Sequence, residues 1–125
     1  MEKLIFDTGV KSYRVSGGGV LKFNPTDPNI YARFLAAAEE IRGAEAQLQE
    51  QTDALAAVTA LDKKVKELLG GVFQGNDFDA LLGGVNLLAV ASNGKTVVAN
   101  LLAALQPILV EGAKLCARSI AREAQ

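Results

Sequence analysis

Residues that could carry out chemistry are few in this sequence, and they stand in incomplete motifs. Residues 92–96 (Ser-Asn-Gly-Lys-Thr) contain the Gly-Lys-Thr that ends a phosphate-binding loop. The complete motif needs a second glycine five residues before Gly94, where this chain has Ala89. No clear strand leads into the segment either. The pattern therefore favours a turn followed by the start of a helix over a nucleotide site.

Metal and acid–base chemistry have equally little support. Asp77 and Asp79 match the beginning of a calcium loop, but the glycine and glutamate positions that complete it do not follow. The chain contains no His, which is the usual base near neutral pH and the commonest transition-metal ligand. Cys116 lies in an apolar helical pattern, so we expect a buried and inert thiol. The sequence predicts no enzymatic activity, no metal and no cofactor.

The overall composition favours one small, mostly helical domain covering residues 1–125. Half of the residues are hydrophobic and only 6% are aromatic, with Ala and Leu dominating. The 13 basic and 14 acidic residues give a net charge of −1, which argues against nucleic-acid binding. The single cysteine excludes an intrachain disulfide. The apolar run 80–91 is too short for a membrane span, and no signal peptide is visible, so we expect a soluble cytoplasmic protein.

The first 24 residues have the pattern of short strands. Segments 4–6, 11–15 and 20–23 are apolar or alternating and are separated by turn residues, which predicts a three-stranded antiparallel β-meander. Leu21 and Phe23 share the face opposite Lys22. Because such a sheet is too small to be stable alone, this face must pack on helices or on another subunit.

Residues 23–35 mark the change from strand to helix. Pro25 and Pro28 cannot donate to a central β-ladder. Thr26 or Asp27 can cap a first helical turn, and Pro28 suits its first position. The remainder, residues 26–125, is therefore predicted to be helical, and the fold class is α+β with helix predominating.

After Pro28, apolar residues recur at heptad spacing. Phe34, Ile41, Leu48 and Leu55 are each seven residues apart, which is typical of a coiled-coil-like seam. One helix over residues 28–69 would be about 60 Å long, whereas a domain of this size is about 36 Å across. This mismatch predicts self-association through the seam. The alternative is a helical hairpin that breaks near Asp53 or Thr59.

Two further helices are expected. The first is short, covers residues 77–82, and is capped by Asn76 or Asp77. The second is long, covers residues 95–122, and should be kinked by Pro107. Between flexible glycines, the short helix carries three apolar residues that could bind a partner instead of joining the core: Phe78, Leu81 and Leu82.

Several short segments together resemble a known group of proteins. They are Phe-Asn-Pro-Thr-Asp-Pro-Asn-Ile-Tyr at 23–31, Asp-Phe-Asp-Ala-Leu-Leu-Gly-Gly at 77–84, and Asn-Gly-Lys followed by Leu-Gln-Pro-Ile in the last helix. In this order they look like small prophage tail proteins of Gram-positive bacteria, which are similar to tail assembly chaperones. The resemblance covers most of the chain but includes no catalytic motif.

The resemblance implies a non-enzymatic role in which the protein binds phage tail proteins, such as the tape-measure protein or tail-tube components, during assembly. A homo-oligomer is expected, with no nucleic acid and no membrane among the partners. The alternatives are a structural or oligomeric component of a phage tail, and a helical protein-interaction module of another kind.

Overall fold

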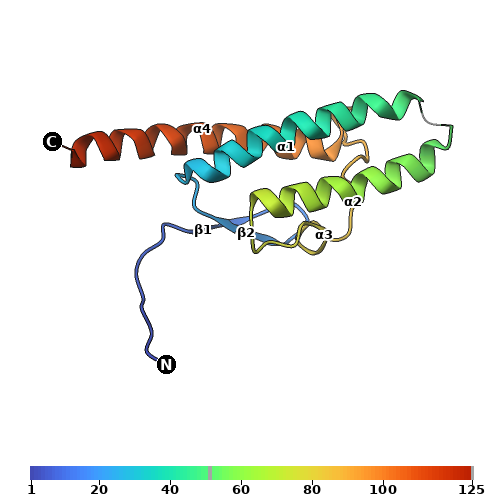
Figure 1. Ribbon diagram of the computed structural model, residues 1–125. Helices are drawn as coiled ribbons and strands as arrows, with labels where there is room; N and C mark the ends of the chain where they lie inside the picture. Colours follow the sequence, from blue (N-terminus) through green and yellow to red (C-terminus); the bar gives the residue numbers. More distant parts are fainter. Residues whose placement is uncertain (51, 125) are drawn as a thin grey trace.

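The computed structural model describes residues 1–50 and 52–124 and shows an α+β fold that is 59% helical. An antiparallel sheet comes first and helices follow, as predicted, and the sheet has two strands (Figure 1). The elements in chain order are β1 (Lys11–Arg14), β2 (Val20–Phe23), α1 (Pro28–Gln47), the 3-10 turn η1 (Leu48–Glu50), α2 (Ala54–Val72), α3 (Phe78–Leu81) and α4 (Val97–Glu123).

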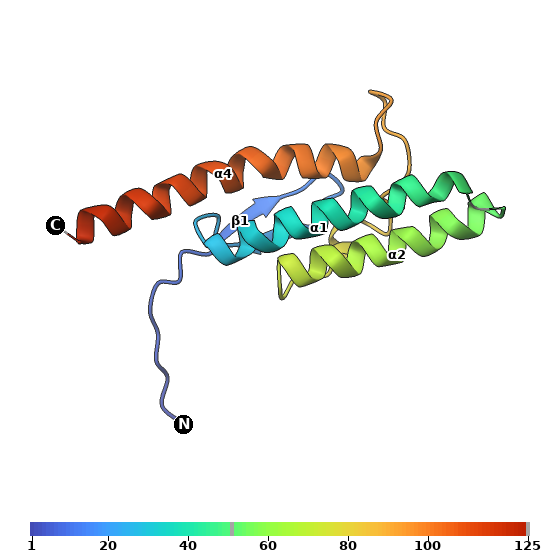
Figure 2. The same ribbon diagram turned by 45° about the horizontal axis from the view of Figure 1, so that its top comes forward.

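The sheet is a hairpin, and the prediction of a third strand is wrong. β1 and β2 pair in a register that places Tyr13 opposite Leu21. Leu21 and Phe23 are buried, as predicted from their shared face. Residues 4–6 are apolar but pair with no strand, and the segment leads away from the body of the molecule in both views (Figures 1 and 2). The apolar sequence of residues 4–6 indicates a strand, but a strand forms only where a neighbouring strand pairs with it.

The turn between sheet and helix follows the local chemistry. The Asp27 carboxylate accepts a hydrogen bond from the Asn29 amide at 2.9 Å, and Pro28 occupies the first helical position. Just before it, the side-chain oxygen of Asn24 accepts from both the amide and the hydroxyl of Thr26. The predicted start of the helix at Pro28 is confirmed.

Residues 28–69 form a helical hairpin, so of the two alternatives the single long helix is wrong. α1 ends at Gln47, and α2 begins after Asp53, whose carboxylate accepts from the Ala56 amide at 3.1 Å. The far end of α2 is held to α1 by Arg33, whose guanidinium donates to the Val72 carbonyl at 3.1 and 3.3 Å. A cation at this position complements the negative end of the helix.

The three long helices lie in a row with α1 between α2 and α4 (Figure 2). The β-hairpin of β1 and β2 lies with α3 along one side of this row (Figure 1). Four aromatic side chains join the sheet to the segment after α2. Their ring centroids follow one another at 4.9, 4.9 and 5.8 Å, in the order Tyr13, Phe23, Phe73 and Phe78.

Two glycines permit close approach between segments. Gly19, in the hairpin, leaves no room for a Cβ beside the backbone of Leu81. Gly112 does the same on α4, where the carbonyl of Pro25 packs against it. α4 continues unbroken through Pro107 and bends along its length, and its last turns extend beyond the other elements (Figure 2).

Candidate functional site

The predicted partner-binding residues lie mainly in the core. Phe78 is 2% exposed, and Leu81 and Leu82 are 7% and 8% exposed. α3 forms where it was expected, because the Asp77 carboxylate caps it by accepting from the Ala80 amide at 3.2 Å. Phe78 belongs to the aromatic row and Leu81 packs against Gly19. Of the three, only Leu82 also borders an open cleft.

The four residues of the predicted self-association seam also differ in their exposure. Phe34 and Ile41 are 3% and 1% exposed within the single chain, where α1 packs on α2 and α4. Leu48 is half-buried in η1. Leu55, at the start of α2, is 78% exposed. Self-association stays a prediction, and of these four residues Leu55 is exposed and Leu48 partly accessible, whereas Phe34 and Ile41 are buried.

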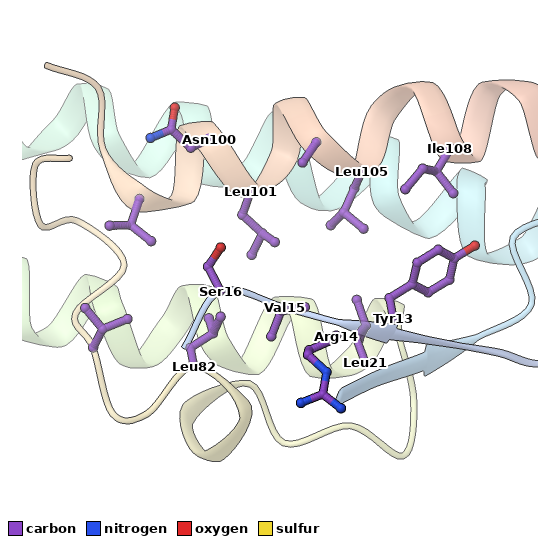
Figure 3. Close-up of a pocket in the computed structure, with 13 residues that line it drawn as sticks. Tyr13, Arg14, Val15, Ser16, Leu21, Leu82, Asn100, Leu101, Leu105 and Ile108 are labelled. Carbon is purple, nitrogen blue, oxygen red and sulfur yellow. The ribbon is translucent and has the colours of Figure 1, made fainter. Parts of the chain in front are cut away.

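The cleft that Leu82 borders is a groove between β1 and α4, with a volume of about 370 Å³. In Figure 3, Leu101, Leu105 and Ile108 point from α4 toward the hairpin, and the groove lies between them and β1. Tyr13, Val15 and Leu21 line the opposite side, and Leu82 and Val85 are also part of the lining. Aliphatic side chains therefore form most of the lining. We call this cleft the β1–α4 groove.

Polar groups border the β1–α4 groove in small number. They are the side chains of Arg14, Ser16 and Asn100, together with the hydroxyl of Tyr13. Figure 3 shows the guanidinium of Arg14 pointing away from α4. Asn100 is engaged with Asn93, whose side-chain NH2 donates to it at 2.9 Å. This arrangement suits an apolar ligand with a few polar contacts at the rim.

The sequence did not reveal this groove, although it contained one signal. The apolar positions of the last helix, including Val97, Leu101 and Ile108, cover more of its circumference than one neighbour can bury. Only Val98, Leu105, Leu109 and Gly112 of α4 are buried. An apolar stripe wider than the buried face indicates a second, partly uncovered face.

The segment that resembled a phosphate loop is a turn and a cap, as predicted. The side-chain oxygen of Asn93 accepts from the Lys95 amide at 3.1 Å, and Gly94 has a φ of +82°. The Thr96 hydroxyl accepts from the Ala99 amide at 3.2 Å and caps α4. Lys95 itself is exposed.

A partly buried ionic network joins α2 to α3 and to the segment before α4. Lys66 on α2 donates to Asp62 at 2.9 Å and to Asp79 of α3 at 2.6 Å. The second oxygen of Asp62 accepts from the Leu87 amide at 2.7 Å. Burial lowers the pKa of Lys66, but the hydrogen bonds and charges of the two carboxylates outweigh it and raise the pKa above 10.5. These bonds satisfy the buried Asp62 and join three segments, which is a structural role.

Two remaining expectations concern α4. Cys116 is half-buried, so its thiol is less enclosed than predicted. By length and composition alone, α4 is also apolar enough to cross a membrane, a property that it shares with core helices of soluble proteins. Here α4 packs beside α1 and contributes Leu105 and Leu109 to the core.

No protein-family model, curated protein or solved structure matches this chain.

Proposed function

We propose that this chain is a non-enzymatic binding protein whose β1–α4 groove holds an apolar segment of a partner. The observation that carries the proposal is the groove itself, which is open and mostly aliphatic. Ligand sites are typically concave and apolar with a few polar groups, and this groove has that character. Leu101 and Ile108 are only partly buried, so a bound apolar segment would remove their remaining surface from water.

The proposed partner is a phage tail protein, such as the tape-measure protein, held soluble in the bacterial cytoplasm until assembly. This part of the proposal rests on the resemblance of residues 23–31 and 77–84 to prophage tail proteins. A tape-measure protein is long and exposes apolar faces before the tube forms around it. A protein that covers such faces needs apolar surface and no catalytic group, which agrees with the lining of the groove.

The experiment is co-expression with the neighbouring tail genes, followed by pull-down. The test variants are Val85→Asp and Ile108→Asp, because both residues line the groove and neither is fully buried. Leu55→Asp is the matched control, since it places the same charge at an exposed apolar residue far along the chain from the groove. Substituting Leu81 or Leu82 would test folding instead, because both are buried.

We expect the wild type and Leu55→Asp to retrieve a tail protein, and both groove variants to lose most of it while keeping the wild-type circular dichroism spectrum. If the folded wild type retrieves no tail protein, the chaperone role is wrong. If both groove variants bind as well as the control, the role stands and the site is elsewhere.

A structural tail component is the second candidate, and a particular surface favours it. The last turns of α4 extend beyond the body, and Leu115 and Ile120 there are 43% and 62% exposed. Such residues suit permanent contacts in an assembly. Finished particles distinguish the two candidates, since a chaperone is absent from them and a structural component is present.

A further inference from the structure

The two outer edges of the β-hairpin differ in their hydrogen bonding. On β2, the backbone N–H and C=O of Lys22 point away from β1 and are both bonded to the side-chain amide of Asn76, each at 2.9 Å. Asn76 therefore acts as a one-residue substitute for a third strand. The edge of β2 is closed at this point.

The edge of β1 is open. Ser12 is opposite Lys22 in the register, so its N–H and C=O also point out of the hairpin, and those of Arg14 do the same two residues later. In the described part of the chain, neither amide donates a hydrogen bond to another group. A row of unpaired backbone groups of this kind is a template for strand addition. It borders the β1–α4 groove, so an added strand would lie against α4.

Residues 3–7 have the pattern that such a strand requires. In an extended segment Leu4 and Phe6 share one face, while Lys3, Ile5 and Asp7 share the other. The first face is entirely apolar and the second carries two charges. Leu4, Ile5 and Phe6 are 88%, 85% and 69% exposed in the single chain. An amphipathic strand with this much uncovered apolar surface needs a neighbour.

The length of the segment also fits. From Val97 to Ile108, α4 runs along the groove for about 17 Å, at about 1.5 Å per residue. Counted in the same way, from its first Cα to its last, a strand of five residues spans about 13 Å, at about 3.3 Å per residue. Residues 3–7 therefore fit within the length of the groove.

The chain's own segment is held away from this edge. Thr8 accepts a hydrogen bond through its carbonyl from the Asn24 side chain at 2.9 Å. The Gly9 amide donates to Asp7 at 2.8 Å, and Gly9 has a φ of +75° with the Asn24 side chain packed against it. These contacts direct residues 1–6 away from the body (Figure 1). Folding back onto β1 of the same chain would break them.

We infer that residues 3–7 of a second copy of this chain add to the open edge of β1 as an antiparallel strand, with Leu4 and Phe6 in the β1–α4 groove. The exchange is reciprocal, so the dimer has two-fold symmetry and both edges are closed. The inference uses the groove of the proposed function but does not depend on the phage partner. In the dimer, residues 3–7 of one copy occupy the groove of the other copy until a partner segment displaces them.

Charge selects the register of the added strand. Side chains directly opposite each other lie on the same face, so Leu4 and Phe6 must face Tyr13 and Val15 or their neighbours. Placing Lys3 opposite Arg14 would bring two like charges together. Shifting by two residues instead puts Phe6 opposite Tyr13 and Leu4 opposite Val15, which avoids this repulsion.

Sedimentation of the purified full chain, with any tag at its C-terminal end, is the first test. We expect a dimer at micromolar concentration. Phe6→Asp should weaken it by about 100-fold or more, because a carboxylate would enter an apolar groove. Ile5→Asp is the matched control, and it should weaken the dimer by less than about threefold, because this residue faces solvent. Both substituted residues, Ile5 and Phe6, are exposed in the single chain, so neither variant threatens the fold.

Disulfide formation between two separately prepared pools tests the register. In a Cys116→Ser background, a pool of Leu4→Cys is mixed with a pool of Val15→Cys and oxidised. A cross-linked dimer containing both chains is expected, because directly opposite residues satisfy the geometry of a disulfide. Ile5→Cys in place of Leu4→Cys should link poorly, since its side chain lies on the other face.

Three results would overturn the inference. They are a monomeric wild type, a dimer that tolerates Phe6→Asp as well as Ile5→Asp, and equal cross-linking of the Leu4→Cys and Ile5→Cys pools. None of these results bears on the pull-down of a tail protein, so the failure of the dimer and the failure of the proposed function are distinguishable.

Discussion

The two edges of the small hairpin face very different surroundings. Beside β2, Phe23 contacts Phe73, Gly19 touches Leu81, and Asn76 occupies the backbone groups of Lys22. Beside β1, the outward backbone groups of Ser12 and Arg14 are unpaired among the described residues, and Arg14 lines the apolar groove. Both strands have four residues and a similar alternation, so the strands themselves do not explain the difference.

The difference lies in what the rest of the chain places beside each strand. The segment after α2 covers β2 with aromatic and amide side chains, whereas α4 stands off from β1 and leaves the groove between them. A two-stranded hairpin is marginally stable by itself. The fold therefore has to stabilise the edge of β2, so that the edge of β1 can remain available to a partner. The following predictions test this division, beginning with the largest effect.

Phe23→Ala should produce the largest loss of stability. The side chain is 3% exposed and contacts both Tyr13 and Phe73, so its removal leaves a cavity at the centre of the closed side. We expect a decrease of about 3–5 kcal/mol in the free energy of unfolding, measured by urea denaturation. Tyr13→Ala should cost less than half as much, because Tyr13 borders the groove. A loss below about 1 kcal/mol for Phe23→Ala would show that the closed side is loosely packed.

Gly19→Ala should destabilise the protein by about 1–3 kcal/mol, because the new methyl group would overlap the backbone of Leu81. Gly43→Ala is the matched control. Gly43 lies within α1 with nothing within 4 Å of the added Cβ, so this substitution should stabilise by about 0.5–1 kcal/mol. Thermal melting of both variants measures the difference. Equal effects would mean that Gly19 is not in close contact with α3.

Asn76→Asp should cost about 1–2 kcal/mol, because a carboxylate can still accept from the Lys22 amide but cannot donate to the Lys22 carbonyl. Ser12→Ala, on the open edge, should change the free energy of unfolding by less than about 0.5 kcal/mol. Chemical denaturation of the two variants in parallel gives the comparison. Similar values would remove the distinction between the edges.

The smallest expected effect concerns pH. The pKa of Lys66 is higher in the folded chain than its ordinary value of 10.5, so the folded state holds this proton more tightly than the unfolded state. The resulting stabilisation is complete below about pH 10.5 and is lost as the pH rises through the folded-state pKa. Lys66→Gln should therefore flatten the alkaline decline in melting temperature.

Lys64→Gln is the control for the pH experiment. Lys64 is on the same helix, but its side chain is 49% exposed and lies 3.7 Å from Glu40 at the surface. The melting temperature of Lys64→Gln should decline at alkaline pH as that of the wild type does. If Lys64→Gln and Lys66→Gln behave alike, the network of Lys66, Asp62 and Asp79 does not contribute to the pH dependence.

Local chemistry made much of the fold predictable. Pro28, Asp27 and Asp77 fix their helix ends by contacts within three residues, and all of these positions are recognisable in sequence. The heptad spacing of Phe34 and Ile41 correctly marks an apolar face, but spacing cannot say whether a second chain or a second helix covers it. Here α2 and α4 of the same chain cover it.

The site was less predictable because its parts are distant in sequence. Asn76 meets Lys22 across 54 residues, and no local pattern reports such a pairing. The flanking glycines indicate a possible partner contact at Phe78, Leu81 and Leu82, yet all three side chains are buried, and a glycine pattern cannot distinguish the two outcomes. Residues 4–6 have the sequence of a strand, and in the single chain they lack the neighbour that would make them one.

Hydrogen exchange at three backbone amides tests the central claim most directly. The measurement uses NMR on the Phe6→Asp variant, in which the edge of β1 is kept empty. We predict that the Lys22 amide is protected by its bond to Asn76, while the amides of Ser12 and Arg14 exchange at nearly the rate of an unstructured peptide. Equal protection at all three amides would contradict the account, because it would show that the fold itself closes both edges of the hairpin.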